Sequence, residues 1–228
     1  MKTYTLTLSD LDINKNEIYL NLGYGGQTPD IQFIEMIDQM VDQINSFCIP
    51  CAGYLISSGK ITDKNYLVIN NIRIKVGPVI TKYLYGATHF AAFIATAGEK
   101  FDNYLDRFKA EGDIVSEFLA YSIGSEIAEA TVRFVTDRIT QEADKSGFNI
   151  THSYSPGHCS WHVREQQHLF SLLSERPCGV KLNESSLMHP VKSVSGIIGL
   201  GKELEITPHG CEICGMVSCF KRKMTESN

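Results

Sequence analysis

The spacing of apolar side chains predicts several helices along this chain. Between residues 31 and 47, and again between residues 99 and 145, apolar residues recur every three or four positions. This spacing places them on one face of a helix. Thr28 and Pro29 favour a helix start before the first segment, with a capping hydroxyl and a proline in the first turn. Gly112 divides the second segment into two helices.

Shorter apolar or alternating segments predict strands. The expected strands cover residues 4–8, 17–22, 48–56, 66–69, 72–76 and 89–95. Two further helices are expected, a short one at residues 77–84 and one at 161–173 that Ser160 caps. Strands and helices do not alternate regularly, so the pattern favours an α+β fold with an antiparallel or mixed sheet.

Composition narrows the class of protein. A chain of 228 residues suits one domain, or one domain with a small appendage, and its 43% hydrophobic and 21% charged residues are typical of a globular protein. The net charge of −5 argues against nucleic-acid binding. No apolar run reaches the ~20 residues that cross a membrane, and the N-terminus does not resemble a signal peptide. We therefore expect a cytoplasmic protein with neither nucleic acid nor membrane as a partner.

Seven cysteines in such a chain indicate metal, cluster or thiol chemistry rather than a disulfide framework. Cys211, Cys214 and Cys219 lie close together, and the Cys-x-x-Cys spacing lets two thiolates bind one centre. Thiolates suit an iron–sulfur cluster or zinc; a group of reduced surface thiols is the alternative. A four-coordinate centre needs one more ligand. The candidates are Cys159, Cys178, His158 and His209.

Other polar residues are expected to be structural. Cys48 and Cys51 form a second Cys-x-x-Cys, but at a helix-to-strand junction, whereas a redox dithiol sits at the N-terminus of a helix. Cys178 lies in a proline–glycine turn. Glu126 is expected to form a surface ion pair with Arg133 on one helix. The sequence contains no motif that supports a hydrolase.

Three segments stand out by their residues: Gly-Ser-Glu-Ile-Ala-Glu at 124–129, Ser-Pro-Gly-His-Cys-Ser-Trp at 155–161, and Leu-Asn-Glu-Ser-x-x-Met-x-Pro at 182–190 followed by Lys-Ser-Val-Ser-Gly at 192–196. Together they resemble the activation domain of cobalamin-dependent methionine synthase, and especially the stand-alone relatives of that domain. The resemblance is clear over residues 124–201 and holds only in outline before them.

The resemblance implies an α+β body at residues 1–206, with a cysteine-rich metal or cluster segment at 207–228 packed on it. In methionine synthase the activation domain binds S-adenosylmethionine and packs over the cobalamin domain, where it supports reductive methylation of oxidised cobalt. The expected role here is reduction of cob(II)alamin to cob(I)alamin on a partner. This chain has no cobalamin-binding Asp-x-His-x-x-Gly segment. The implied partners are a corrinoid protein or cobalamin-dependent methyltransferase, and an electron donor.

The resemblance also implies the site residues. Two short segments would line the pocket that faces the corrinoid or S-adenosylmethionine: Pro156, Gly157 and His158, and Ser193, Val194, Ser195 and Gly196. Stand-alone relatives pair a Gly-Tyr-Cys-x-Trp segment with C-terminal cysteines, which favours Cys159 as the fourth ligand. With Cys211, Cys214 and Cys219 it would hold an iron–sulfur cluster that passes one electron to cobalt. Iron is favoured over zinc because the implied role is electron transfer.

One position departs from the family. The family's S-adenosylmethionine loop carries an arginine four residues before its Gly-Tyr pair; this chain has Ser153 there, and His158 replaces the tyrosine. Serine cannot hold the methionine carboxylate through two hydrogen bonds as arginine does. We therefore expect weak S-adenosylmethionine binding or none. The alternative functions are a non-enzymatic corrinoid-protein binding module with structural zinc, and an S-adenosylmethionine-binding methyltransferase.

Overall fold

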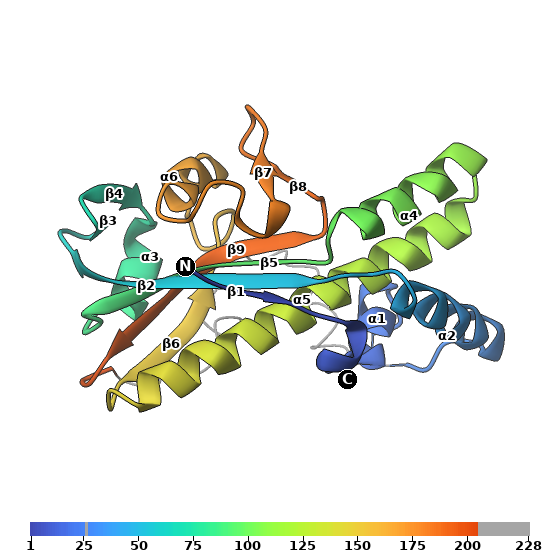
Figure 1. Ribbon diagram of the computed structural model, residues 1–228, viewed down its shortest axis with the longest axis horizontal. Coiled ribbons are helices and arrows are strands. Elements are labelled where there is room, and N and C mark those ends of the chain that lie inside the picture. The colour runs from blue at the N-terminus through green and yellow to red at the C-terminus, as the bar shows by residue number, and fades with distance from the viewer. Residues whose placement is uncertain (26, 205–228) are drawn as a thin grey trace.

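The structure, a computed structural model, describes residues 1–25 and 27–204. Its centre is a curved antiparallel sheet of seven strands (Figure 1). Six of them follow the order β4-β3-β2-β5-β9-β6, and β1 pairs with the first residues of β2, on the edge opposite β5. A separate hairpin consists of β7 and β8. The strands are β1 (Lys2–Thr5), β2 (Cys51–Ile61), β3 (Tyr66–Ile69), β4 (Ile72–Lys75), β5 (His89–Thr96), β6 (Asn149–Tyr154), β7 (Lys181–Leu182), β8 (Met188–His189) and β9 (Ser193–Gly201).

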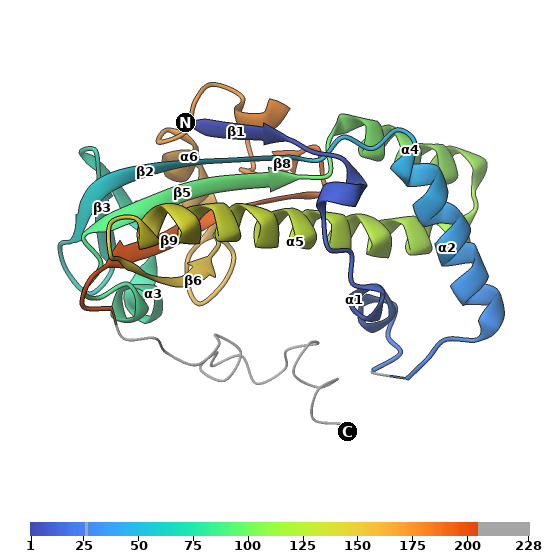
Figure 2. The same ribbon diagram turned by 60° about the horizontal axis from the view of Figure 1, so that its bottom comes forward.

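Helices cover both faces of this sheet. The α-helices are α1 (Lys15–Asn21), α2 (Ile31–Asn45), α3 (Gly77–Tyr83), α4 (Glu99–Glu111), α5 (Ile114–Asp144) and α6 (Gln166–Phe170). Three single 3-10 turns are η1 (Leu8–Asp10), η2 (Val163–Glu165) and η3 (Pro177–Gly179). The long helix α5 runs along one face of the sheet, as Figure 2 shows. The predicted α+β class with an antiparallel sheet is confirmed.

Two hydrophobic cores result from this arrangement. On the α5 face, Ile127 and Val135 pack with Phe93 and Ile198 of the sheet, and all four side chains are fully buried. The opposite face is covered by α3, α6 and the segments around them. There the largest buried side chain is Trp161, which packs with residues of β5 and β9. The central strands β5 and β9 are therefore buried on both sides.

Most predicted helices and strands are confirmed, but residues 17–22 are not a strand. They lie largely in α1, which begins after Asn14. The Asn14 side chain accepts a hydrogen bond of 3.0 Å from the amide of Asn16, the usual capping contact at a helix start. Ile18 is completely buried against the α5-face core. Capping and packing therefore override the alternating pattern.

The predicted helix at 161–173 and its cap are also wrong. The segment contains only η2 and the five-residue α6. Ser160 has a φ of 71°, outside the extended region that a capping residue normally adopts, and the cap is instead the His162 ring, which accepts from the Arg164 amide at 3.1 Å. Thr28 likewise does not cap α2, because that helix begins at Ile31.

The predicted cysteine-rich segment, residues 207–228, lies outside the described residues. Within the described part of the chain, no helix combines the length and apolar character needed to cross a membrane.

Candidate functional site

The loop after β6 is closed by three backbone hydrogen bonds. The His158 amide donates to the Ser155 carbonyl at 3.2 Å, the Gly157 amide to the Trp161 carbonyl at 2.7 Å, and the Trp161 amide to the His158 carbonyl at 2.8 Å. Gly157 has a φ of 96°, which a residue with a side chain rarely adopts. Trp161 is 1% exposed and anchors the loop, whereas Gly157 and His158 are exposed. The loop therefore presents His158 from a fixed base.

This loop begins beside β9. Tyr154, the last residue of β6, pairs with Ile197, and its carbonyl oxygen lies over Gly196. A Cβ atom on Gly196 would be 2.5 Å from that oxygen and 2.8 Å from the Phe93 ring. Only glycine permits this approach. Gly196, in the second segment predicted to line the pocket, thus lies beside Tyr154, which comes two residues before Pro156 of the first segment.

The hydroxyls of β9 have partners within the protein. Ser195 is buried and donates to the Gln166 side chain of α6 at 3.3 Å. Ser193 contacts the Thr96 hydroxyl at 2.8 Å and the Pro190 carbonyl at 2.7 Å. Val194 packs against the α5-face core. These contacts position β9, and a role of Ser193, Val194 or Ser195 in ligand contact stays a prediction.

Lys192 is a buried lysine that the family resemblance includes only as part of a motif. Its side chain is 5% exposed, its ammonium donates to the Ser125 hydroxyl at 2.8 Å, and it lies 2.9 Å from the centre of the Tyr121 ring. Burial lowers the pKa of Lys192 to about 7, although the charge of Asp102 acts in the opposite direction. Lys192 lies two positions before Val194, so the alternation of side chains along an extended chain predicts that both point toward α5.

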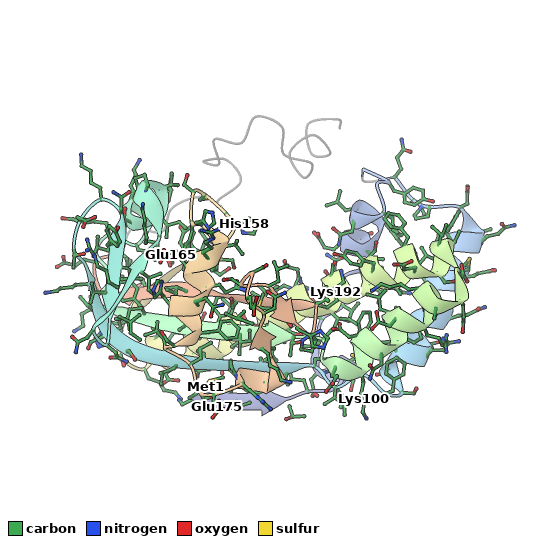
Figure 3. All side chains as sticks on the ribbon, turned by 90° about the horizontal axis from the view of Figure 1, so that it is seen from above. Met1, Lys100, His158, Glu165, Glu175 and Lys192 are labelled. Carbon is green, nitrogen blue, oxygen red and sulfur yellow. The ribbon has the colours of Figure 1, made fainter. Side chains whose placement is uncertain are left out.

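Asp102 lies near Lys192 and is 4% exposed. One carboxylate oxygen accepts from the Val191 amide at 2.7 Å and lies 3.4 Å from the His189 ring nitrogen. The other oxygen has no hydrogen-bond partner among the described residues. Figure 3 shows Lys192 near the centre of the curved molecule and His158 on the loop of one half. Charged groups thus gather where β8 leads into β9.

Glu126 differs from its expected surface position. Its side chain is 1% exposed, and it accepts from the Asn14 amide at 2.8 Å and from Arg133 at 2.5 Å. Arg133 also donates to the Asp12 carbonyl at 2.7 Å. Burial raises the pKa of Glu126, although these hydrogen bonds act to lower it. The ion pair is present, but it joins the segment before α1 to α5 and does not lie on a helix surface.

The segment at 182–190 forms the β7–β8 hairpin. The Asn183 side chain accepts from the Leu187 amide at 2.9 Å and the Asn183 amide donates to the Leu187 carbonyl at 3.0 Å, which closes the turn. A pocket of about 480 Å³ lies between this turn and the segment that contains η2 and the start of α6. It is lined by His162, Val163, Arg164, Gln167, Glu184, Ser185 and Ser186.

Of the predicted metal ligands, the structure describes only Cys159. It directly follows His158 in the loop, is half-buried against the core beneath it, and has a φ of 49°. Cys211, Cys214 and Cys219 lie outside the described residues. Within residues 1–25 and 27–204 there is no group of three His, Cys, Asp or Glu side chains placed to hold a metal. The shared site therefore stays a prediction.

The other cysteines are arranged differently from the Cys-x-x-Cys pattern. Cys48 is buried and its thiol donates to the Ala97 carbonyl at 3.3 Å, while burial raises its pKa to about 12. This agrees with the predicted structural role. Cys51 instead hydrogen-bonds to the thiol of Cys178, more than a hundred residues away. Nothing in the local sequence indicates that pair.

Comparison with known proteins agrees with this arrangement. Residues 79–205, more than half of the chain, match the family of the vitamin B12 dependent methionine synthase activation domain. The chain belongs to this family. Its fold is similar to a crystal structure of the MetH reactivation domain bound to AdoHcy, with 16% sequence identity and a TM-score of 0.69. The match covers 90% of this chain and 80% of that one. No curated protein matches the chain.

Proposed function

We propose that this protein takes part in the reductive reactivation of a corrinoid carried by a partner methyltransferase or corrinoid protein. The family match over residues 79–205 carries the proposal, because that span contains the loop after β6, the β7–β8 hairpin and β9. Cob(I)alamin that loses one electron becomes cob(II)alamin and is inactive. Reactivation returns one electron to cobalt from a donor.

An apolar patch next to Lys192 supports a docked partner. It consists of Phe118 and Tyr121, one turn apart on α5, and each of these side chains is about half exposed; the Tyr121 ring contacts Lys192. Exposed apolar side chains that lie together often mark an interaction site. In this proposal the corrinoid protein covers the patch, and the loop that carries His158 faces the corrinoid.

The proposed electron carrier is an iron–sulfur cluster held by Cys159, Cys211, Cys214 and Cys219. Cys159 supports this assignment because it lies in the loop that would face the partner. A cluster bound there would be close to the corrinoid, which favours direct electron transfer. Structural zinc held by the same thiolates is the alternative, and it would make the protein a binding module rather than an electron carrier.

Anaerobically prepared protein, supplied with a low-potential reductant, tests this function. We expect iron and sulfide in the wild type, and faster formation of cob(I)alamin from corrinoid-bound cob(II)alamin, followed by its visible absorbance. Cys159→Ser should lose most of the iron and reduce that rate at least about tenfold, because serine is a poor ligand for a soft centre. Cys48→Ser is the matched control. Cys48 is buried, lies far from the loop residues in the sequence, and its thiol donates only to the Ala97 carbonyl.

The possible outcomes separate the alternatives. Stoichiometric zinc without iron would favour the binding module. Iron that persists in Cys159→Ser would show that the fourth ligand is another residue. An iron-loaded protein that leaves the rate of cob(II)alamin reduction unchanged would contradict the proposed electron transfer.

S-adenosylmethionine binding is a second candidate property, favoured by the AdoHcy bound to the similar structure. It would supply a methyl group that traps the reduced cobalt. Against tight binding stands Ser153, an exposed residue of the edge strand β6 that offers no positive charge for a carboxylate. Calorimetric titration of the isolated protein measures this directly, and a tight stoichiometric complex would show that other residues hold the ligand.

A further inference from the structure

Cys51 and Cys178 bring two thiols together from distant parts of the chain. Cys51 is the first residue of β2, where it pairs with Thr5 of β1 on one side and Thr96 of β5 on the other. Cys178 is the middle residue of η3, which packs against β2 and β5. Both side chains are half-buried, and their thiols hydrogen-bond to each other. The fold therefore creates a dithiol.

This dithiol and Cys48 lie on opposite faces of the sheet. Ala52 and Tyr54 of β2 pack in the α5-face core, so Cys51 points to the opposite face. Cys178 packs against the core on that opposite face. Cys48 belongs to the α5-face core. The Cys-x-x-Cys pair is thus divided between two faces, and the partner of Cys51 is Cys178.

The hydrogen bond makes the two thiols chemically unequal. The Cys178 thiol donates to the Cys51 sulfur, and this contact lowers the pKa of Cys51, although burial opposes it. The same contact, together with burial, raises the pKa of Cys178. The thiolate is the reactive form of cysteine. The contact therefore favours Cys51 as the first thiol to react, and Cys178 is placed to react with it afterwards.

The backbone around Cys178 is held in an uncommon conformation. Arg176 and Cys178 have φ values of 48° and 53°, in the left-handed region that residues other than glycine seldom occupy. Amide hydrogen bonds of 3.0 Å from Gly179 to Arg176 and from Val180 to Pro177 hold this turn. Such conformations occur preferentially at sites where a side chain must be presented in one direction. Here the side chain presented is the Cys178 thiol.

We propose that Cys51 and Cys178 form a peroxide-oxidised, reversible disulfide. The Cys51 thiolate attacks hydrogen peroxide, its sulfur is oxidised to a sulfenic acid, and hydroxide leaves. The Cys178 thiol then attacks that sulfur, the disulfide forms, and the sulfenic oxygen leaves as water with the thiol proton. Two thiols and one peroxide give one disulfide and two waters, and a dithiol reductant reverses the change.

The disulfide would covalently join the start of β2 to the segment that leads into β7. This segment precedes the hairpin that forms one wall of the 480 Å³ pocket. Because the bond would close a loop of more than a hundred residues, it should stabilise the folded protein markedly. The proposal does not depend on the corrinoid function, because it concerns neither the loop after β6 nor the C-terminal cysteines.

Peptide mapping of the full chain tests the proposal. Fully reduced protein is treated anaerobically with one equivalent of hydrogen peroxide, alkylated and digested with trypsin. We expect peptide 16–60 linked to peptide 165–181, and the same link in Cys48→Ser, whose peptide 16–60 contains only Cys51. The midpoint of thermal unfolding should rise by about 5–15 °C on oxidation and fall back after reduction. Cys51→Ser should show neither the link nor the rise.

Different products would overturn the proposal. A bond between Cys48 and Cys51, or a bond from peptide 16–60 to the peptide that contains the C-terminal cysteines, would show that the paired thiols do not react together. Recovery of Cys51 and Cys178 as alkylated thiols after peroxide treatment of the folded wild type would also contradict it. Cys178→Ser gives a further check, because Cys51 should then stop at the sulfenic acid, which dimedone labels.

Discussion

The two faces of the central sheet are built in different ways. One face is covered by α5, a regular helix of 31 residues with periodic apolar contacts. The other is covered by the short helix α3 and by helical turns and loops between residues 155 and 190. Non-glycine residues with left-handed φ values concentrate in these loops: Cys159, Ser160, Arg176, Cys178 and Ser186. In the rest of the described chain only Asn70 and Asn71 share this property, and asparagine tolerates it well.

The two faces therefore have different roles: the α5 face supports the sheet, and the loops of the other face present exposed groups. Repeated packing determines the conformation of α5, and no single side chain of that helix decides it. The loops of the other face depend on particular hydrogen bonds and on one or two buried anchors such as Trp161. Such loops place exposed groups, including His158, in fixed positions on a rigid scaffold, which is the usual arrangement of binding sites. The segments that identify the family lie mainly in these loops and in β9.

The largest expected effect comes from Gly196, where the end of β6 approaches β9. Gly196→Val should destabilise the protein by about 3 kcal/mol or more, because a side chain there meets the Tyr154 carbonyl and the Phe93 ring, both held by the sheet. Urea unfolding measures the change. The matched control is Gly157→Ala: no atom lies within 4 Å of a Cβ atom there, so only the positive φ costs energy, about 1–2 kcal/mol. Equal losses would show that Gly196 is not a close contact.

The same contrast explains which features the sequence predicts. Periodicity correctly predicts α2, α4 and α5, because many residues contribute to each helix. It fails at α1, where the Asn14 cap and the burial of Ile18 decide, and at the segment after Ser160, where a left-handed turn replaces a cap. Motif resemblance draws attention to residues 156–158, which lie in the loop after β6, and their role in lining a pocket stays a prediction. The resemblance cannot predict the Cys51–Cys178 pair or the burial of Lys192, because these depend on tertiary contacts.

The second expected effect is a dependence of protein stability on pH, caused by Lys192 on the α5 face. Its pKa is about 7 in the folded protein and near 10.5 when unfolded, because burial penalises the charge. Between these values the unfolded state binds more protons, so stability should increase as pH rises from 7 to 10, by up to a few kcal/mol. Asp102, His189, Ser125 and Tyr121 surround the group. Asp102, Ser125 and Tyr121 favour the charged form and reduce the size of the effect, whereas His189 contacts Asp102.

Urea unfolding at pH 7 and pH 9.5 measures this dependence. Lys192→Met should remove most of it and should stabilise the protein at pH 7 relative to the wild type. Lys109→Met is the control, because Lys109 is an exposed helix residue paired with Asp106. If the wild type and Lys192→Met change in parallel with pH, Lys192 keeps its charge in the folded state and the hydrogen bond to Ser125 compensates for burial.

The smallest expected effect is on S-adenosylmethionine affinity and concerns the edge strand β6, where the sheet leads into the loops. Ser153 is exposed on β6, two residues before the loop that starts at Ser155, and it is the position at which the resemblance places the family's arginine. Ser153→Arg should increase the affinity for S-adenosylmethionine by about 10–100-fold, since a charged hydrogen bond contributes roughly 1.5–3 kcal/mol. Ser153→Lys should gain less, because an ammonium cannot form the two parallel bonds of a guanidinium with a carboxylate. Calorimetric titration of the three proteins gives the order. If neither variant gains affinity, Ser153 does not limit S-adenosylmethionine binding, and His158→Tyr, at the position of the family's tyrosine, is the next variant to test.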